Sequence, residues 1–424
     1  MDFAIPTRIK DLLAEIDAFI AAEIHPLEAQ GDNARFFDHR REHARTDWDN
    51  EGLPRPEWEA LLKQMQGRAD KAGLLRLALP EEFGGRDVGN LAMACIREHL
   101  ANKPIGLHND PQTEKSIVGN FPQILMYRDF GRPGQRETWI NGSLDGSLYA
   151  SFALTEPDHG SDATWMKTRA VRDGNGWRIT GAKMWNTAIH VSTHDIVFCR
   201  TSGKQGDAKG ISAFIVPMDS PGVKIESYYW TFNMPTDHAH VTFQDVYVPD
   251  DALLGPLDDG LVLARHFVNE NRIRQAASSL GAGVFCLDAA VEYAMERKPF
   301  GKPLAINQGI QFPTVELATQ AEMLRLLIHK TAWEMDQMTG PEVQAKLSDK
   351  VSMCNYWANR FCCEAADWAI QVHGGLGYSR HKPFEHIYRH YRRYRITEGT
   401  EQMQMRNVAG HLFGFIGAKR ANAG

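Results

Sequence analysis

The chain has 424 residues, of which 43% are hydrophobic and 24% are charged. This length predicts two or three domains of roughly 150 residues each, and the composition is that of a globular protein, which excludes a disordered or fibrous chain. The 47 Lys and Arg against 53 Asp and Glu give a net charge of −6. No overall positive charge therefore attracts nucleic acid, and we expect no nucleic-acid partner.

No apolar run reaches the roughly 20 residues that a membrane span needs. The best candidate, residues 16–24, is interrupted by Asp17 and Glu23. We therefore expect no membrane partner. Secretory and organelle signals are basic, whereas this N-terminal stretch is acidic, so we expect a cytoplasmic location. The six cysteines are scattered without a C-x-x-C pair, which predicts buried, reduced thiols.

The first third of the chain is predicted to be mostly helical. Apolar residues recur at helical spacing from Thr7 to Ile24; Thr7 can cap this helix, and we expect Pro26 to end it. A charged stretch follows at residues 31–56. Further helical patterns cover residues 58–65, 91–100 and 116–126.

Short runs rich in β-forming residues begin at Leu148. These runs cover residues 148–154, 170–172, 177–180, 195–201, 211–218 and 240–248. Gly174-Asn175-Gly176 predicts a hairpin turn between the second run and the third. Several short strands separated by turns are typical of a small barrel or sandwich.

Long helical patterns return beyond Asp258. They cover residues 261–297, 309–338 and 342–372, and Gly374-Gly375 is expected to stop the last helix. Helices of this length pack as a bundle. The expected fold is therefore mainly α with a β middle domain: a helical N-terminal domain at 1–147, a β domain at 148–257 and a C-terminal helical bundle at 258–424.

Common nucleotide and hydrolase motifs are absent from the sequence. Gly281-Ala282-Gly283 resembles the start of a dinucleotide fingerprint but lies within a helical pattern, and no P-loop or G-x-S-x-G occurs. His386 and His390 lie four residues apart without the Glu of H-E-x-x-H, so a solvated or interface pair is expected and no metal site. The Arg and Tyr residues of 386–395 favour a subunit-facing surface or a phosphate-rich small ligand.

Five motifs stand in a consistent order along the chain. They are Ser151 to Asp162 (SFALTEPDHGSD), Lys183 to Thr187 (KMWNT), Arg297 to Leu304 (RKPFGKPL), Gln371 to Gly375 (QVHGG) and Arg395 to Thr400 (RITEGT). Any one of them could be a simple turn. Together, over a stretch from about Leu77 to Val408, they resemble the acyl-CoA dehydrogenase family of FAD-dependent enzymes. This resemblance implies a three-part fold, with a four-helix bundle at its C-terminal end, and a homotetramer built as a dimer of dimers.

The resemblance assigns contacts with FAD to all five motifs. It implies that Thr155 reaches the edge of the isoalloxazine, that Trp185 packs against the flavin, and that Arg297 meets the pyrophosphate, for which a guanidinium fork is well suited. It also implies that the segment 371–375 reaches FAD from a neighbouring subunit. The full implied set is Phe152, Leu154, Thr155, Gly160, Ser161, Trp185, Asn186, Thr187, Arg297, Phe300, Gln308, Gln371, Val372, His373, Gly374, Gly375, Thr400 and Gln402.

Glu398 matches the family's catalytic base. The resemblance implies that its carboxylate takes the α-proton of an acyl-CoA thioester while hydride leaves the β-carbon for flavin, which gives the trans-2-enoyl-CoA. Burial beside flavin and substrate is expected to raise the pKa of this carboxyl group. Electrons are then implied to pass to an electron-transferring flavoprotein. The implied substrate contacts are Ser161, Asn269, Arg272 and Gly399.

The chain departs from the family pattern at several positions. Asp158-His159 stands where Gly-Ala is common, Asn186 stands where Ile is common, and the charged segment around residues 36–48 is unusual. These departures leave the acyl group open. Two alternatives remain: an acyl-CoA oxidase or flavin monooxygenase of the same fold that uses oxygen, and an inactive member that serves as a binding or assembly subunit. Glu398 favours proton abstraction over oxygen insertion.

Overall fold

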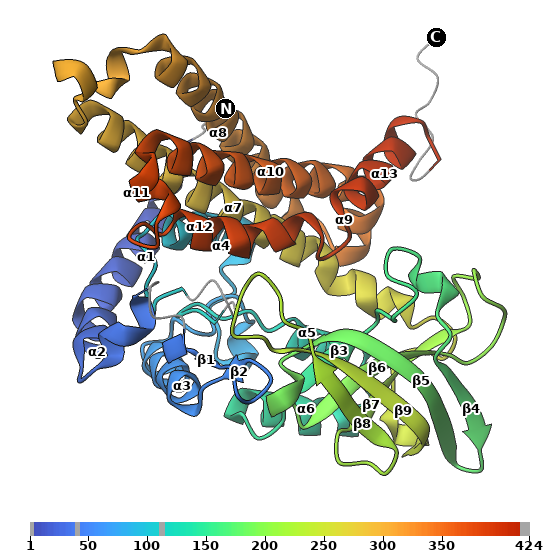
Figure 1. Cartoon of the computed structure of the whole chain (residues 1–424). Coiled ribbons are helices and arrows are strands. Elements are labelled where there is room, and N and C mark those ends of the chain that lie inside the picture. Colours follow the sequence, from blue (N-terminus) through green and yellow to red (C-terminus); the bar gives the residue numbers. More distant parts are fainter. Residues whose placement is uncertain (1–3, 39–42, 110–114, 416–424) are drawn as a thin grey trace, which may run out of the picture. The chain divides into compact units, whose positions relative to one another are not determined.

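The computed structural model describes residues 4–38, 43–109 and 115–415. These residues form two compact units (Figure 1). The first, called the helical unit below, combines the described residues of Met1–Arg45, Pro56–Gly119 and Asn269–Gly424. The second, called the β unit, combines Thr46–Arg55 and Asn120–Val268. Helices from the two ends of the chain therefore share one unit, while the main sheet lies in the other.

The N-terminal helices of the helical unit surround a core that contains Ile16, Trp58 and Met65. The prediction that Pro26 ends the first helix is wrong. Pro26 lies in the first turn of α2, where a backbone N–H has no partner within the helix, so the ring is tolerated. The helices of this part are α1 (Thr7–Phe19), the π-helix η1 (Ile20–Ile24), α2 (His25–Ala29), α3 (Pro56–Lys71) and α4 (Gly89–Ala101).

The C-terminal helices complete the helical unit, in which α10 packs against α8, α12 and α13. The predicted helix over 342–372 is interrupted at Leu347, whose φ of −129° is not helical. Helix α7 extends into this unit from Asn269 onward. The helices are α7 (Leu261–Glu296), α8 (Gln308–Met335), α9 (Gly340–Lys346), α10 (Ser348–His373), α11 (Gly375–Tyr378), α12 (Phe384–Arg392) and α13 (Glu401–Leu412).

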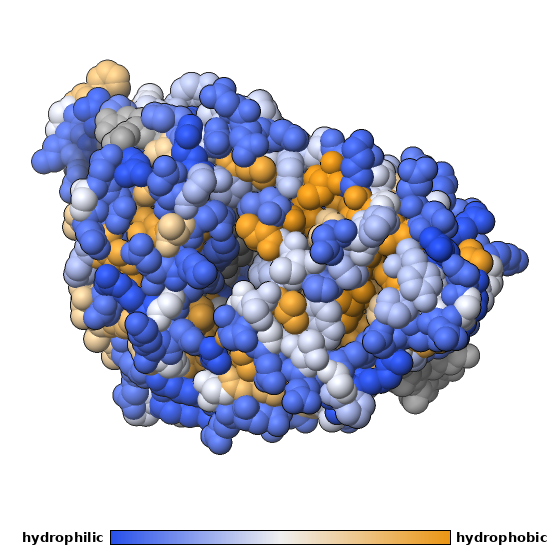
Figure 2. Space-filling model, turned by 90° about the horizontal axis from the view of Figure 1, so that it is seen from below, coloured by the Kyte–Doolittle hydropathy of each residue, from blue (hydrophilic) through white to orange (hydrophobic). Residues whose placement is uncertain are grey.

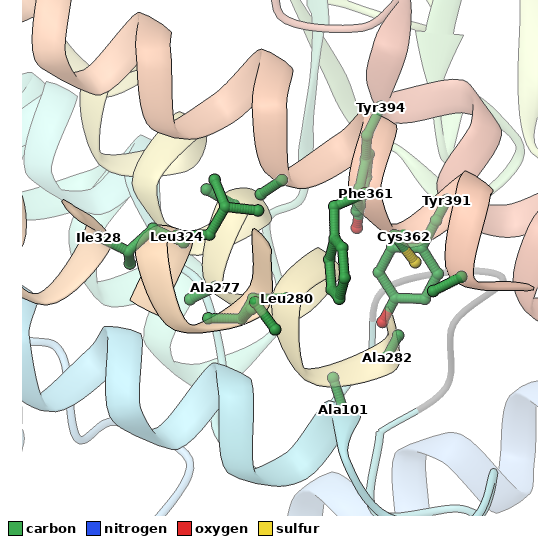
Figure 3. Packing of buried hydrophobic residues seen from close by; sticks show 14 of the residues in the cluster. Ala101, Ala277, Leu280, Ala282, Leu324, Ile328, Phe361, Cys362, Tyr391 and Tyr394 are labelled. Atoms are coloured by element: carbon green, nitrogen blue, oxygen red, sulfur yellow. The ribbon is translucent and has the colours of Figure 1, made fainter. Parts of the chain in front are cut away.

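Small residues allow α7 to approach its neighbours closely. A Cβ on Gly281 would lie 2.2 Å from the carbonyl oxygen of Glu98 in α4, and one on Gly283 would lie 2.4 Å from the Cε1 atom of Phe361 in α10. Figure 3 shows Phe361 among the buried apolar side chains of this core. The Gly-x-Gly pair therefore serves helix packing, as its helical context indicated.

His386 and His390 were expected to be solvated or at an interface, and this prediction is wrong. Both side chains are buried on α12, and the His390 ring lies edge-on to the rings of Tyr391 and Tyr394. Their four-residue spacing places both on the inward face of the helix. Among the described residues, no group of three or more His, Cys, Asp or Glu side chains could hold a metal ion.

The β unit is built around an eight-stranded sheet, with the strand order β10-β7-β6-β4-β5-β9-β8 and with β3 paired in parallel with β6. Helices α5 (Pro122–Phe130) and α6 (Pro133–Asp145) belong to the same unit. The strands are β3 (Ala150–Ala153), β4 (Arg169–Asp173), β5 (Gly176–Thr187), β6 (His194–Arg200), β7 (Ile211–Pro217), β8 (Val223–Tyr228), β9 (His238–Pro249) and β10 (Leu253–Leu254). The short strands β1 (Thr46–Asp47) and β2 (Leu53–Pro54) pair with each other.

Strand β8 and the start of helix α5 differ from what the sequence predicted. Strand β8 is half-exposed and carries Lys224 and Glu226, so it lacks the dense apolar run that identified the other strands. The helical pattern predicted over 116–126 begins only at Pro122, because Ser116 forms an isolated β-bridge with Asn109. The hairpin turn at 174–176 is confirmed by the pairing of Asp173 with Gly176.

The surface drawn in Figure 2 is mostly hydrophilic, with apolar residues gathered in separate patches. Mixed surfaces of this kind are normal for globular proteins. All six cysteines are buried and free, as predicted. In the described part of the chain, no helix is both long enough and apolar enough to span a bilayer.

Candidate active site

The catalytic motif forms a tight loop between Arg395 and α13. Glu398 has a φ of +55° and Gly399 a φ of +91°. A non-glycine residue in the left-handed region costs of order 1 kcal/mol, so the surrounding structure must hold this loop. Thr400 caps α13 by accepting a hydrogen bond from the backbone N–H of Met403 at 3.4 Å.

Two side chains hold the backbone of this loop from within the helical unit. Arg272, on α7, donates from Nε and Nη2 to the carbonyl oxygen of Glu398 at 3.1 and 2.7 Å. Gln404 donates from Nε2 to the carbonyl oxygens of Glu398 and Gly399 at 3.0 and 3.1 Å. Burial lowers the pKa of the Arg272 guanidinium, and the charge of Glu398 opposes this shift. The carbonyls of the loop are thus anchored while the Glu398 side chain remains partly exposed.

An ion-pair cluster fixes the start of α13. Glu401 accepts hydrogen bonds from Nε of Arg360 and Nε of Arg395, each at 3.0 Å. These guanidinium groups lower the pKa of Glu401 to about 2, Arg360 through the larger effect. Glu401 is therefore an ionised anchor at the start of α13.

Asn269 lies one helical turn before Arg272 on α7. Its side chain is buried and donates from Nδ2 to Oε1 of Gln344 at 3.0 Å. The sequence predicted substrate contacts for Asn269 and Arg272. In the described structure, the Asn269 Nδ2 group and the Arg272 guanidinium have partners in their own unit, while Oδ1 of Asn269 is buried without a hydrogen-bond partner. Their contacts with a substrate stay a prediction.

The predicted pyrophosphate residues follow the end of α7. Arg297 and Gln308 are exposed, and the Phe300 ring projects into solvent from a backbone with a φ of +54°. The segment is tied back on itself, since the Leu304 N–H donates to the carbonyl oxygen of Arg297 at 2.7 Å. These side chains are accessible to a ligand, and their contacts with FAD stay a prediction.

The residues 371–375 divide between interior and surface. Val372 and His373 are buried, and the His373 ring stacks on Tyr293 at 4.2 Å between centroids. Gln371, Gly374 and Gly375 are exposed, and a Cβ on either glycine would meet no atom within 4 Å. Prediction of FAD contacts for the Val372 and His373 side chains therefore needs correction, because these side chains pack inside the helical unit. A ligand can reach only their backbone.

In the β unit, the predicted segment 152–161 leaves β3 and turns back on itself. Phe152, Leu154 and Thr155 are half-buried, whereas Gly160 and Ser161 are exposed. The carbonyl oxygen of Thr155 accepts a hydrogen bond from the Met184 N–H at 3.0 Å, which joins this segment to β5. The structure therefore brings the motif at 151–162 beside the motif at 183–187.

A buried ion pair lies beneath these two motifs. The Lys183 ammonium donates to Oε1 of Glu156 at 2.9 Å and to the carbonyl oxygen of Leu154 at 3.1 Å. Glu156 also accepts from the N–H groups of Lys167 and Thr168 at 2.6 and 2.9 Å. Burial opposes ionisation of Glu156, but Lys183 and these N–H groups lower its pKa overall. Glu156 thus fixes the loop instead of facing a ligand.

The segment 185–187 bulges out of β5. Met184 pairs with His240 and Asn186 with Ala239 on β9, which leaves Trp185 as an extra residue with a φ of +66°. Its indole is exposed and lies 4.5 Å from the Tyr229 ring, between centroids. Thr187 is also exposed.

Asn186 was predicted to bind FAD, and its side chain requires a correction. It is fully buried and donates from Nδ2 to Oδ2 of Asp195 at 2.5 Å. Asn186 points inward because it neighbours a bulged residue whose side chain points outward. Ser151, on β3, supports the same segment by donating from Oγ to the carbonyl oxygen of Thr187 at 2.8 Å.

Sequence reasoning missed the residues that support the site. Gln404 lies only six residues beyond Glu398, at i+4 from the cap Thr400, and this short spacing could have indicated that it returns to the loop. Nothing in the sequence indicated that Arg360 reaches Glu401, because they come from helices 41 residues apart. Nothing in the sequence indicated either that Asp195 accepts a hydrogen bond from Asn186.

Comparison with known proteins identifies relatives along the whole chain. Family models for the acyl-CoA dehydrogenase N-terminal, middle and C-terminal domains match residues 8–147, 151–246 and 258–413. The human mitochondrial short-chain specific acyl-CoA dehydrogenase is 31% identical over 412 residues, which cover 96% of this chain and 90% of the relative. The caffeyl-CoA reductase-Etf complex subunit CarC of Acetobacterium woodii is 31% identical over 345 residues, which cover 81% of this chain and 87% of the relative. The solved butyryl-CoA dehydrogenase of Megasphaera elsdenii superposes with a TM-score of 0.75 at 25% identity and covers 97% of this chain and 100% of its own.

Proposed function

Because the chain belongs to the acyl-CoA dehydrogenase family, we propose that it catalyses the FAD-dependent α,β-dehydrogenation of an acyl-CoA thioester to the trans-2-enoyl-CoA. The family makes the protein an oxidoreductase that acts on acyl-CoA. The observation that carries the proposal is the loop at Glu398, whose carboxyl group is partly exposed while its own carbonyl is anchored by Arg272 and Gln404.

The residues present fit FAD in each unit. In the helical unit, the exposed guanidinium of Arg297 suits a pyrophosphate, and Gly374 and Gly375 leave open space where a Cβ would stand. In the β unit, Trp185 exposes a flat indole that can lie against an aromatic ring system. When bound, FAD accepts the hydride that leaves the β-carbon of the acyl group.

Glu398 holds the proton-transfer role in this proposal. The α-proton of a thioester is weakly acidic, so the base must be placed within hydrogen-bond reach of that carbon-bound proton. The loop anchors fix the backbone from which the carboxylate extends, which reduces the orientational freedom that would otherwise be lost in the transition state. Thr400 and Gln402 follow on α13, and we assign them to FAD on the family pattern.

The central experiment replaces the base. Glu398→Gln should retain FAD and lose anaerobic flavin reduction by acyl-CoA by about 10²- to 10⁴-fold, the usual contribution of a positioned general base. Glu364→Gln, an exposed acid on α10, is the matched control and should leave the rate unchanged. Flavin reduction by Glu398→Gln at the wild-type rate would remove Glu398 from this role. Butyryl-CoA is the first substrate to test, since it is named in the Megasphaera relative.

The proposed electron acceptor is an electron-transferring flavoprotein. One relative is named as a subunit of a complex with Etf, which supports this choice. Substrate-reduced enzyme should therefore be reoxidised slowly by oxygen and rapidly by added electron-transferring flavoprotein. A high yield of hydrogen peroxide in air would instead indicate an acyl-CoA oxidase. A cytoplasmic location is part of the proposal, and cell fractionation tests it.

We also propose a homotetramer arranged as a dimer of dimers. Helix α8 carries a stripe of exposed apolar side chains at spacings of three, eight, three and seven residues, which keeps them on one face: Phe312, Val315, Met323, Leu326 and Trp333. An apolar stripe of this kind is typical of an interface. Light scattering should give a mass four times that of the monomer. The double variant Met323→Glu, Leu326→Glu should give a smaller mass. A wild-type protein that is monomeric would contradict this assembly.

A further inference from the structure

Two polar side chains lie inside the sheet behind the Trp185 bulge. Asn186, on β5, and Asp195, on β6, are both fully buried. Besides the hydrogen bond from Asn186 Nδ2 to Asp195 Oδ2, each side chain has one further oxygen: Oδ1 of Asn186 and Oδ1 of Asp195, both buried and without a donor in the described structure. Two buried acceptors without donors are unfavourable. A proton on one of these oxygens would let it donate a hydrogen bond to the other, so neither oxygen would be left without a partner.

The charges around Asp195 also favour a proton. The ionisable groups that face it are Lys183 on β5, Glu156 in the loop after β3, and Cys199 on β6. The single cation, Lys183, is already paired with Glu156 at 2.9 Å. Burial raises the pKa of the Cys199 thiol to about 12, so this thiol is neutral. An ionised Asp195 would therefore be a second buried negative charge with no cation of its own.

We propose that Asp195 is protonated below pH 7 and then forms a two-hydrogen-bond acid–amide pair with Asn186, and that this pair positions Trp185. In the pair, the amide N–H donates to Oδ2 of Asp195, and the carboxyl O–H donates from Oδ1 to the amide Oδ1. Oδ1 of Asn186 then gains a donor, and Oδ1 of Asp195 becomes that donor and is no longer an unpaired acceptor. Burial raises the pKa of Asp195 to about 7, although Asn186, Lys183 and the backbone N–H of Ile196 oppose the shift, and this direction agrees with the pairing.

The pair acts on Trp185 through the backbone. Asn186 and Trp185 are consecutive, so fixing the amide inward fixes the indole outward at the bulge. The neighbouring anchors, Ser151 on the carbonyl of Thr187 and Asp237 on the N–H of Ala188, hold the far side of the same segment. Asp195 is thus a positioning residue. Its relevance to catalysis rests on the proposed function, because only there does Trp185 meet the flavin.

The protonation state is tested by infrared spectroscopy on the purified full chain. Wild type minus Asp195→Asn should show the carbonyl band of a buried, protonated carboxylic acid at pH 6, and this band should decrease as the pH is raised through 7. Asp195→Asn preserves the shape and can form an equivalent amide–amide pair, so it is expected to fold. Identical spectra for the two proteins at pH 6 would overturn the proposal.

The positioning role is tested by the signal of one indole. The Trp185 contribution to fluorescence and near-ultraviolet circular dichroism is obtained for each variant by subtracting the same variant with Trp185→Phe. Asp195→Asn should retain this contribution, whereas Asn186→Leu, which can form no pair, should shift its emission and lose most of its dichroism. An unchanged contribution in Asn186→Leu would refute positioning. If Asn186→Leu does not fold, Asn186→Asp, which places a second acid in the pair, should show the same loss above pH 7, and retention there would refute positioning equally.

These measurements do not depend on turnover. They need neither acyl-CoA nor an electron acceptor, so failure of the proposed dehydrogenation would leave their outcome unaffected. Conversely, if the wild-type protein shows no carboxylic acid band but still dehydrogenates acyl-CoA, only the acid–amide pair is overturned.

Discussion

Replacing Arg272 with Gln tests whether the loop anchors control catalysis. The guanidinium donates two hydrogen bonds to the carbonyl oxygen of Glu398, at 3.1 and 2.7 Å. A shorter, neutral Gln can at best replace one of them. A hydrogen bond from a charged group contributes about 1.5–3 kcal/mol and a neutral one about 1 kcal/mol, so exchanging two charged bonds for one neutral bond loses about 2–5 kcal/mol of loop anchoring.

If the transition state loses this free energy of anchoring, the rate of the chemical step falls accordingly. Each 1.4 kcal/mol corresponds to a factor of ten, so the rate constant of anaerobic flavin reduction should fall by roughly 30- to 4,000-fold in Arg272→Gln. The fall should appear in kcat, because the anchor positions the base. A substrate contact of the kind that the sequence predicted would instead appear mainly in KM.

The matched control is Arg274→Gln on the same helix. Arg274 lies two residues further along α7 and pairs with Glu270 of the same helix at 3.3 Å. It should leave the reduction rate within about twofold of wild type. Equal losses in the two variants, or a wild-type rate in Arg272→Gln with FAD content and melting temperature preserved, would refute the anchoring argument.

Three further predictions concern stability. Lys183→Met leaves the carboxylate of Glu156 buried without its cation, which should destabilise the β unit by about 3–5 kcal/mol in urea unfolding, and the double variant with Glu156→Gln should recover part of this loss. Gly283→Ala places a Cβ 2.4 Å from an aromatic carbon and should cost about 1–3 kcal/mol in the helical unit, measured the same way; an unchanged midpoint would contradict the packing. Burial opposes protonation of His329, but contacts with a buried thiol and with Glu98 raise its pKa from 6.5 to about 9. Its stabilisation is therefore complete below pH 6.5 and should be lost, by at most about 3 kcal/mol, as the pH rises through 9; hydrogen exchange of α8 should show this loss in wild type and not in His329→Gln.

Local pattern was sufficient for most of the secondary structure. The strands with dense apolar runs and the long C-terminal helices were predicted within a few residues, because periods of 2 and 3.6 identify faces that must be buried. The errors share a cause. At Pro26 and Leu347 the backbone geometry of neighbouring turns decided where a helix ended, and β8 is too polar for its sequence to indicate a strand.

The candidate site was predicted as a set of motifs, and the structure separates their roles. Glu398, Arg297 and Trp185 are accessible, as the family resemblance implied. Asn186 and His373 belong to the same motifs but point inward. A motif records which residues occur together, and only the direction of each Cα–Cβ bond in the folded chain determines which of them can touch a ligand.

The sequence by itself therefore determined the family and the order of the elements, and it predicted Glu398 as the base. The tertiary structure decided which side chains hold that acid in place. Arg272 and Glu398 are 126 residues apart, and Asn186 and Asp195 lie on different strands. Pairings of this kind depend on how helices and strands pack, and no short-range pattern in the chain specifies them.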